Sequence, residues 1–248
     1  AGLIGAEISN LAFEADANVT ILDIDKKNAS KIINKNSKIK YEYFDCSDPK
    51  NLENNLKKII KKIGCPDVFI NCSYPTDKNW SKTSFKKITK KILDQNILIH
   101  LNSYSWIAKL VADEMQKNHK FGSIIQFSSI YGILGQDLSI YEKTNMTENM
   151  VYSIIKGGIN NLTRQMASYY GKYNIRINTI SPGGLTGHTK GKKSNQDKIF
   201  TKNYSAKVPL GRLGMPEEIA YCAIFLGSNA SSYITGSNLV VDGGWSII

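Results

Sequence analysis

The sequence has few of the residues that build disulfide frameworks or metal centres. Its four cysteines (Cys46, Cys65, Cys72 and Cys222) show no paired spacing, and reduced thiols in a cytoplasmic protein account for them most simply. The three histidines are scattered and form no metal-ligand pattern with the cysteines. The sequence therefore predicts neither a disulfide framework nor a metal site.

Long hydrophobic runs are also lacking. No apolar stretch is long enough to cross a bilayer, so no transmembrane helix is expected. Hydrophobic residues make up 42% of the 248 residues, a share that suits one sizeable α/β domain. The chain has no internal repeat and no linker that would divide it.

Acidic residues are too few to balance the basic ones. The formal net charge is +11, and a charge of this sign is typical of proteins that bind nucleic acid or anionic membranes. The lysines, however, are spread over amphipathic segments such as 51–62 and 81–91, beside abundant asparagine. We therefore interpret the charge as a solvated surface and expect no nucleic acid and no membrane as partner. Steering of an anionic substrate, phosphorylated or nucleotide-linked, is an intermediate alternative.

Glycines stand at the beginning of the sequence, where residues 1–5 run directly into an apolar-periodic segment, 6–15. Glycines followed by a helix form a phosphate-binding turn, because backbone N–H groups and the helix dipole favour an anion. A strand should precede this turn, and in a doubly wound fold that strand lies in the middle of the sheet. We therefore expect that the sequence begins inside its glycine loop and folds poorly without the strand. A cooperative melt of residues 1–248 would contradict this.

Asp23 ends a segment, 18–23, that is typical of a buried parallel strand. A carboxylate roughly 20 residues beyond a glycine turn accepts hydrogen bonds from the adenosine ribose hydroxyls and repels a 2′-phosphate. Asp23 therefore favours NAD over NADP, although Lys26 and Lys27 weaken that preference. A solvated carboxylate at a strand end is the alternative interpretation.

Further strands are predicted over 39–44, 66–73, 121–129, 175–180 and 239–241. Polar residues follow or end several of them, and ligands bind at the carboxyl ends of strands in open α/β sheets. Asp45 is placed to contact an adenine amino group, Asn71 ends the segment 66–73, and Ser129 ends the segment 121–129. Helical periodicity predicts helices over 26–36, 49–62, 81–93, 96–117 and 152–170, and another that begins at residues 215–219.

Tyr152 and Lys156 are four residues apart, so on a helix both side chains lie on one face. A free tyrosine has a pKa of about 10, and an ammonium one turn away favours the phenolate and brings that pKa towards the working range. A hydroxyl from Ser129 would hold a substrate oxygen beside the phenol. This combination predicts proton transfer to or from a carbonyl or alcohol oxygen. The pair alone occurs by chance in many helices, so the prediction depends on the glycine turn and the serine as well.

Two polar segments have no clear period. The insert 136–150 lies in sequence between Ser129 and Tyr152, and we expect it to be irregular. The segment 185–205 has the length and composition of a lid. Asn96 stands in a predicted helix interior, which asparagine disfavours, and a buried side-chain hydrogen bond is its plainest interpretation.

Taken in order, these motifs resemble those of the short-chain dehydrogenase/reductase family, and the resemblance covers essentially the whole chain. The residues that carry it are Gly2-Leu3-Ile4-Gly5, Asp23, Asp45, Asn71-Cys72-Ser73, Asn96, 128–132, Tyr152 with Lys156, 178–183, 233–236 and 241–244. The resemblance implies a single NAD(P)-binding domain over residues 1–248, N-terminally truncated. Its fold would be a Rossmann-like three-layer α/β/α arrangement with a doubly wound parallel sheet whose first strand is missing.

The resemblance also implies a role for each matched residue. Tyr152 would be the acid/base, Lys156 would lower its pKa and hold the nicotinamide ribose, and Ser129 would orient the substrate oxygen. Asn96 would shape its helix and hold a water that links Lys156 to solvent. The implied cofactor-binding positions are Gly2, Leu3, Ile4, Gly5, Asp23, Ile24, Asp45, Cys46, Asn71, Cys72, Ser73, Tyr152, Lys156, Pro182, Gly183 and Leu185. The implied substrate-binding positions are Ser129, Tyr131, Tyr141 and Gly184. The cofactor would be NAD or NADP, the partner a small molecule, and the assembly a homo-oligomer, a tetramer or dimer, built through the helices 96–117 and 152–170.

The sequence departs from the family pattern at several places. Leu3 stands where many relatives have glycine, and Cys72-Ser73-Tyr74 replaces the more usual Asn-Ala-Gly. The insert lengthens the gap between Ser129 and Tyr152, and with the Ser-Pro-Gly-Gly run it is similar to oxidoreductases of bacterial surface-sugar pathways, such as flagellin modification. A 3-oxoacyl-carrier-protein-type reductase is the alternative enzyme. An alternative of another class is a non-catalytic dinucleotide-binding sensor or scaffold, although such proteins usually lack the tyrosine or the lysine.

Overall fold

The computed structural model describes residues 1–187 and 196–248, and within them six strands form the central layer. All of their pairings are parallel. The strands are β1 (Thr20–Asp23), β2 (Lys40–Tyr43), β3 (Val68–Asn71), β4 (Gly122–Phe127), β5 (Ile175–Pro182) and β6 (Asn238–Val241). Each lies within or close to a segment that the sequence predicts as a strand.

The described sheet is in two pieces. β1 pairs with β2, and the order β3-β4-β5-β6 makes up the second piece. The division falls between β1 and β3, where a doubly wound fold has its first strand. The expectation that a strand precedes Ala1 stays a prediction.

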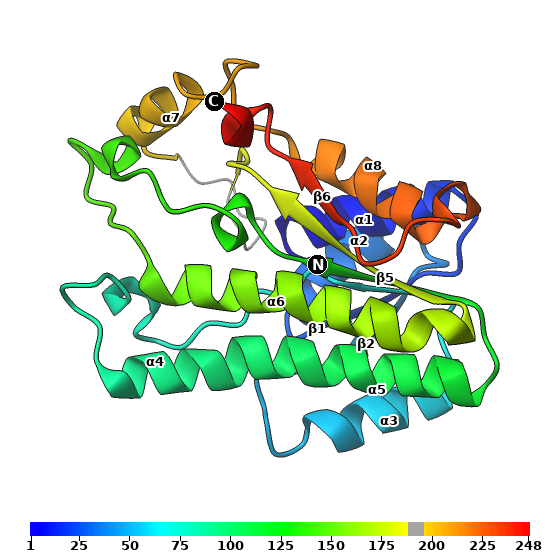
Figure 1. Cartoon of the computed structure of the whole chain (residues 1–248). Helices are drawn as coiled ribbons and strands as arrows, with labels where there is room; N and C mark the ends of the chain where they lie inside the picture. Colours follow the sequence, from blue (N-terminus) through cyan, green and yellow to red (C-terminus); the bar gives the residue numbers. More distant parts are fainter. Residues whose placement is uncertain (188–195) are drawn as a thin grey trace.

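Helices cover both faces of the sheet (Figure 1). One face carries α1 (Leu3–Glu14), α2 (Lys26–Ile33) and α8 (Pro216–Gly227), and the other carries α3 (Leu52–Ile63), α5 (Ser103–Lys117) and α6 (Met150–Tyr170). Two short helices, α4 (Lys90–Asn96) and α7 (Lys198–Ser205), lie towards the end to which the β5 and β6 arrows point. This is the predicted Rossmann-like three-layer α/β/α arrangement.

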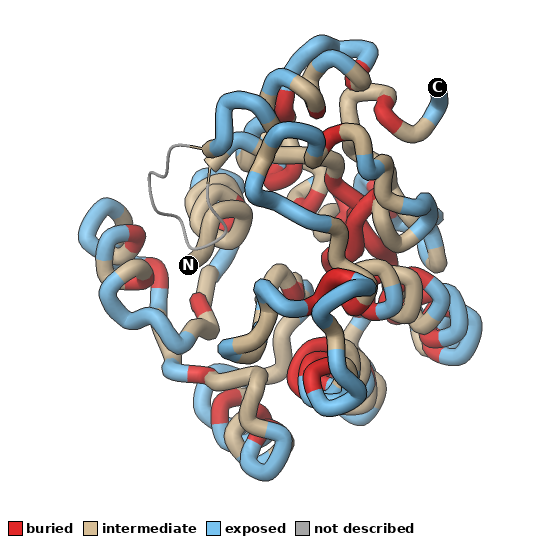
Figure 2. Tube along the Cα trace, turned by 90° about the vertical axis from the view of Figure 1, so that its left-hand side faces the viewer, coloured by how far each residue is buried: buried red, intermediate tan, exposed pale blue. Residues whose placement is uncertain are grey.

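The core continues through the sheet because β4 is buried along its whole length. Successive strand side chains point to opposite faces. Ile124 accordingly packs into the cluster that includes residues of α3 and α5, while Ile125 packs into the cluster that includes residues of α1 and α8. Figure 2 shows the result, with buried segments in the interior and exposed residues on the outer sides of the helices.

The predicted helix over 81–93 is wrong for most of its length. A single 3₁₀ turn spans Trp80–Lys82, and α4 begins only at Lys90, where the Thr89 side chain accepts the Ile92 N–H at 3.4 Å. The segment between them is held in another way, since Phe85 N–H donates to Glu148 of the insert at 3.0 Å. Tertiary contacts therefore override the helical period here.

The predicted helix over 96–117 is interrupted by a π-helical segment, Ile97–Asn102, between α4 and α5. A π segment accommodates an additional residue in the turn and recurs at functional sites. Its effect here is that the helical rod from Lys90 to Lys117 is continuous but changes its winding between Ile97 and Asn102.

The predicted lid, 185–205, contains a helix that the sequence did not indicate. α7 begins after Asp197, whose carboxylate accepts the N–H groups of Ile199 at 2.8 Å and Phe200 at 3.0 Å. Such a cap satisfies donors at the start of a helix. The part of the predicted lid over 188–195 lies outside the described residues. The described residues contain no helix that is both long and apolar enough to cross a membrane.

Candidate active site

The serine segment after β4 is fixed against α6. The Ser128 hydroxyl donates to the Lys156 carbonyl at 2.8 Å. Gly132 makes the approach possible, because a Cβ there would lie 2.7 Å from the Lys156 backbone. The Ser129 hydroxyl accepts the Tyr131 N–H at 3.2 Å. These contacts set Ser129, which is 4% exposed, beside the first turns of α6.

The start of α6 is fixed by the insert. Asn149 caps the helix and accepts the Tyr152 N–H at 2.9 Å. Gln136 holds this cap from both sides, since it donates to the Asn149 carbonyl at 2.8 Å and accepts the Asn149 N–H at 3.0 Å. The insert, which the sequence predicts as irregular, contains one 3₁₀ turn, Leu138–Tyr141, and buries Ile140 completely.

The three groups that the sequence singles out converge at the carboxyl end of β4. Ser129 forms a hydrogen bond with the Tyr152 phenol. The Lys156 Nζ lies 5.5 Å from the centre of the Tyr152 ring and donates to the Phe127 carbonyl at 2.9 Å. The arrangement can hold a substrate oxygen between two hydroxyls with a buried amine behind them.

The expected lowering of the Tyr152 pKa is wrong for this structure. Burial raises the pKa of Tyr152, and the hydrogen bond from Ser129 opposes that rise. The physical reason is that Lys156 is buried too, so its ammonium has lost hydration, and its own pKa is lowered to about 7. An amine that is only partly charged near neutral pH stabilises a phenolate less than a full ammonium would.

Aromatic side chains surround the amine. The Lys156 Nζ lies 5.8 Å from the centre of the Tyr74 ring and 5.3 Å from that of Tyr104, distances at which a ring attracts a cation. The Tyr74 and Trp80 rings lie 6.1 and 6.4 Å from the Tyr152 ring. Sequence analysis missed this wall, and no local pattern indicates Trp80.

The Asn96 side chain forms its hydrogen bonds within the protein. Its Nδ2 donates to the Ile92 carbonyl at 2.9 Å and to Asp77 Oδ1 at 3.1 Å, and its Oδ1 accepts the Asp77 N–H at 3.2 Å. This agrees with the plainest interpretation, a buried side-chain hydrogen bond, and it ties the helix to the preceding loop. The implied water-holding role of Asn96 stays a prediction.

Several aromatic side chains gather after β4. Tyr131 and Tyr141, which the sequence predicts as substrate-binding positions, pack against a cluster that contains Tyr204 and Trp245. The Gly184 N–H donates to the Tyr204 hydroxyl at 2.7 Å, and the Tyr204 ring stacks on Trp245 at 4.3 Å. Sequence analysis missed Tyr204 and Trp245, because neither belongs to a motif and only the chain reversal near the C-terminus brings them here.

The insert is bound to the end of α7. Asp137 forms an ion pair with Lys207, and Asn203 donates to the Ile140 carbonyl at 3.3 Å and to the Glu142 carbonyl at 3.1 Å. We call these three contacts the clasp. The clasp joins two segments whose contacting residues are 61 to 70 positions apart in the chain.

The start of α1 offers backbone donors to an anion. Gly2 precedes this helix and provides no side-chain cap, so first-turn N–H groups are available to an anion. A Cβ at Gly5 would lie 3.1 Å from the Cys72 sulfur, which shows how closely the turn approaches β3. The Nδ2 of Asn71 is buried and has no partner among the described residues.

The remaining predicted cofactor positions lie at the carboxyl ends of neighbouring strands. Asp23 ends β1, and its carboxylate accepts the Asp25 N–H at 2.8 Å. Ile24 beside it is 59% exposed. Asp45 is partly used in its own turn, where it accepts from Ser47. The other positions flank these ends: Leu3 and Ile4 in α1, Cys46 after β2, Cys72 and Ser73 after β3, and Pro182, Gly183 and Leu185 at the end of β5.

These residues fit an adenine dinucleotide. The start of α1 suits phosphate, the carboxylate of Asp23 suits ribose hydroxyls, and the buried amide of Asn71 is an unpaired donor. This fit rests on the hydrogen-bonding groups of Asp23 and Asn71 and on the close approach of Gly5 to Cys72.

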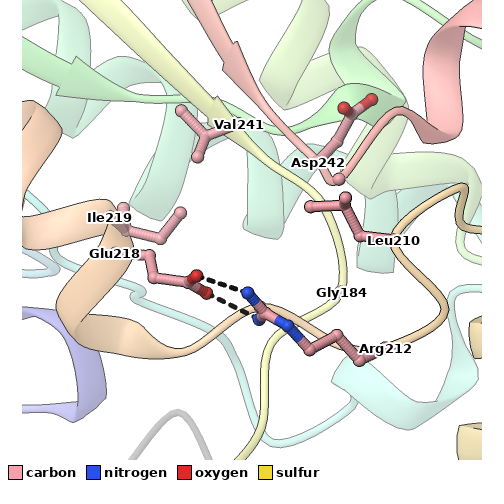
Figure 3. A pocket seen from close by; sticks show the side chains of 9 residues that line it. Gly184, Leu210, Arg212, Glu218, Ile219, Val241 and Asp242 are labelled. Atoms are coloured by element: carbon pink, nitrogen blue, oxygen red, sulfur yellow. Dashed lines mark hydrogen bonds and ion pairs between the residues drawn. The ribbon is translucent and has the colours of Figure 1, made fainter.

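A small pocket lies beside the ends of β5 and β6 (Figure 3). Arg212 and Glu218 face each other across it, with a bidentate ion pair at 2.9 and 2.6 Å. The same carboxylate accepts the Met215 N–H at 2.7 Å, and the Arg212 hydrogen bond lowers the pKa of Glu218 to about 2. The guanidinium is therefore occupied, and the pair stabilises the start of α8 rather than an anion site.

Comparison with known proteins agrees with this geometry. Residues 2–246 match the family profile described as enoyl-(acyl carrier protein) reductase. The chain belongs to the short-chain dehydrogenase/reductase family. It is therefore an NAD(P)-dependent oxidoreductase of that family.

Relatives within the short-chain dehydrogenase/reductase family differ in substrate. The chain is 30% identical to a post-translational flagellin modification protein A of Campylobacter coli, over 82% of this chain and 77% of that protein. It is 34% identical to a 3-oxoacyl-[acyl-carrier-protein] reductase of Chlamydia muridarum, over 97% of this chain and 92% of that one. A solved short-chain dehydrogenase of Leptospira borgpetersenii with bound NAD⁺ has a TM-score of 0.85 at 30% identity, over 99% of this chain and 89% of that one.

Proposed function

We propose that the protein transfers hydride between NAD and the carbon of a secondary alcohol or ketone, with Tyr152 as the acid/base. The convergence of Ser129, Tyr152 and Lys156 at one strand end carries this proposal. The nicotinamide, when bound, gives or accepts the hydride. The side chains of the protein move the accompanying proton.

The proton is held at the Tyr152 oxygen. In ketone reduction this oxygen donates to the developing alkoxide, and in alcohol oxidation it accepts the hydroxyl proton. Ser129 positions the same substrate oxygen, because its hydroxyl already forms a hydrogen bond with the Tyr152 phenol. Lys156 supplies positive charge behind the phenol in proportion to its protonated fraction.

We infer that the substrate is an oxygen-rich molecule, a nucleotide-linked sugar of surface polysaccharide or flagellin modification. Phenols and aromatic rings gather on the substrate side, where Tyr131, Tyr141 and Tyr204 lie in one cluster. Rings pack against sugar faces, and phenols donate and accept hydrogen bonds to sugar hydroxyls. The similarity to a flagellin modification protein supports the same class.

A 3-oxoacyl-carrier-protein-type reductase is the second candidate. The 34% identity to such an enzyme over nearly the whole of both chains favours it. A panel that contains nucleotide sugars and acetoacetyl thioesters separates the two candidates by relative kcat/KM.

For the cofactor, we favour NAD over NADP. The carboxylate of Asp23 ends β1 at the adenosine side, and it would repel a 2′-phosphate. The exposed Ile24 side chain offers an apolar surface to an adenine ring.

The deciding experiment replaces Tyr152 by phenylalanine. We expect kcat to fall by about 10² to 10⁴, because proton transfer by a positioned side chain contributes on that order, while the cofactor Kd changes little. Tyr233→Phe is the matched control, since Tyr233 is fully exposed and lies on neither α5 nor α6. Turnover that survives in Tyr152→Phe contradicts the proposed acid/base.

A non-catalytic sensor or scaffold makes a different prediction. Such a protein would bind NAD without turning over any alcohol or ketone of the panel. The presence of both a partly buried Tyr152 beside Ser129 and a buried, hydrogen-bonded Lys156 favours the enzyme.

We also propose a homo-oligomer built through the outer faces of α5 and α6. Large apolar side chains are exposed there, including Trp106, Ile154 and Tyr169. Exposed large apolar side chains on neighbouring helices support a protein contact.

A further inference from the structure

His100 is a buried histidine that the proposed mechanism does not yet use. It lies in the π segment Ile97–Asn102 and is fully buried. Neither of its ring nitrogens has a hydrogen-bond partner among the described residues. A buried polar group without a partner costs about 1–3 kcal/mol, so an imidazole at this place needs an explanation.

The surroundings of His100 are those of Lys156. Its ring centre lies 5.4 Å from that of Tyr74 and 5.3 Å from that of Tyr104. The Lys156 Nζ lies against the same two rings, at 5.8 and 5.3 Å. The imidazole and the amine therefore share one buried compartment behind Tyr152, without a direct hydrogen bond between them.

The other groups of that compartment are neutral. Burial raises the pKa values of Tyr74 and Tyr104 well above their ordinary value and also raises the pKa of the neighbouring Cys72 thiol. The Tyr104 hydroxyl donates a hydrogen bond to the Ser73 carbonyl at 2.7 Å. Burial, and then the charge of Lys156, lower the pKa of His100 well below its usual value. His100 is thus a neutral imidazole with one donor and one acceptor nitrogen.

We propose that His100 is a positioning residue for the catalytic pair, and that its acceptor nitrogen receives a hydrogen bond from Lys156 through one bridging water. Polar groups that are too far apart for direct contact are commonly joined in this way. The proposal rests on the function proposed for Tyr152 and Lys156. It adds a residue that acts through Lys156 and touches neither substrate nor cofactor.

The consequence is electrostatic. Burial lowers the pKa of Lys156 to about 7, and an acceptor on its ammonium raises that pKa again, because the hydrogen bond favours the charged form. A more fully charged Lys156 in turn favours the phenolate of Tyr152. Loss of the acceptor should therefore move the ionisation of Tyr152 to higher pH.

The test compares His100→Phe with His100→Gln. Phenylalanine keeps a ring in the compartment but has no nitrogen, and glutamine keeps an acceptor. For alcohol oxidation, in which Tyr152 must be deprotonated, we expect His100→Phe to lower kcat by about 10-fold or more. We expect the limb of the pH profile to move up by about one unit, with the cofactor Kd unchanged. In His100→Gln, which keeps an acceptor, both the fall in kcat and the displacement of the pH limb should be smaller than in His100→Phe. An unmoved limb in His100→Phe would show that the ring only fills space.

A second measurement needs neither turnover nor a folded variant at position 100. The ¹⁵N shifts of the histidine rings report whether an acceptor nitrogen is hydrogen-bonded, and His119→Asn and His188→Asn identify the His100 signals by elimination. A hydrogen-bonded acceptor nitrogen supports the proposal, and a free one overturns it. If no substrate is turned over, the proposed function fails, while this measurement still decides the contact of His100.

Discussion

Lys156 has exchanged most of its hydration for aromatic rings and one backbone carbonyl. Lys156 is 3% exposed, and its Nζ donates a hydrogen bond to the Phe127 carbonyl at 2.9 Å. Rings and a carbonyl compensate a cation only in part, so the amine is the group of the site whose charge depends most on its neighbours. Activity near neutral pH should therefore respond to small changes behind Lys156, which is where His100 lies.

Gly5 is a second residue whose local contacts decide function. A Cβ at this position would lie 3.1 Å from the Cys72 sulfur, and a larger side chain would fill the turn that a phosphate must approach. We expect Gly5→Val to weaken NAD binding by about 10-fold or more, corresponding to about 1.4 kcal/mol. Titration calorimetry measures the change.

Gly135→Ala is the matched control for that variant. A Cβ at Gly135 meets nothing within 4 Å, and its backbone is not among the positive-φ glycines. Its cofactor Kd should equal that of the parent protein. Equal NAD affinity in Gly5→Val would mean that the turn at α1 does not hold the pyrophosphate.

At the scale of elements, the insert and α7 act together through the clasp. The insert holds the start of α6 by way of Gln136, and the clasp holds the insert by way of Asp137. A displacement of α7 would therefore also shift the first turn of α6, where Tyr152 lies. This connection explains why a segment so far from Ser129 in the chain belongs to the substrate side.

Asp137→Asn tests the clasp. We expect KM for the substrate to rise several-fold and the cofactor Kd to stay constant, because the clasp borders the substrate side and not the start of α1. The effect on the free energy of unfolding should be below about 1 kcal/mol, as for other partly exposed ion pairs. Asp94→Asn removes the more exposed Lys90–Asp94 pair and should change neither KM nor Kd.

The contribution of the clasp to stability depends on pH. The hydrogen bond from Lys207, and then that from Ser139, lower the pKa of Asp137 to about 2. A carboxyl whose pKa is lowered on folding stabilises the protein above its unfolded pKa of about 3.9 and loses that contribution as the pH falls towards the folded value. Thermal unfolding of the parent and of Asp137→Asn should therefore converge between about pH 4 and pH 2. A difference that persists at pH 2 would contradict the ion-pair interpretation.

At the scale of the whole molecule, apolar and basic residues share the outer surface. Large apolar side chains are exposed on α5 and α6, and also on α8 at Tyr221 and Phe225, while the chain carries a large excess of basic residues. The net charge of +11 keeps monomers apart at low ionic strength, so association through α5 and α6 should be stronger in salt.

Trp106→Glu tests the proposed assembly. Trp106 is 45% exposed on α5, and a carboxylate in an apolar contact would have to be desolvated. Light scattering should give a multiple of the 27.6 kDa chain mass for the parent and a smaller multiple for the variant. Phe85→Glu, at an exposed position before α4, should leave the mass unchanged. A parent mass of one chain would contradict the proposal.

Local patterns predicted much of the fold. Strands such as β3 and β4 could be found because each is a short, largely apolar run, and α6 could be found because its period persists over several turns. The predictions failed over 81–93 and 185–205. In both segments a side-chain cap, at Thr89 and at Asp197, decides where the helix begins. A cap is one residue, and its effect depends on the backbone around it.

The sequence by itself determined the family and the layer order, and it selected Ser129, Tyr152 and Lys156 as candidates for catalysis. These depend on periodicity and on the spacing of residues along the chain. Only the tertiary structure decided the protonation of the site and its walls. Those depend on burial and on contacts between distant segments, such as the rings of Tyr74 and Tyr104 around Lys156. One sequence signal was available, since Asn96, His100 and Tyr104 follow at intervals of four on one helix face. Its meaning appears only when the folded chain places that face behind the amine.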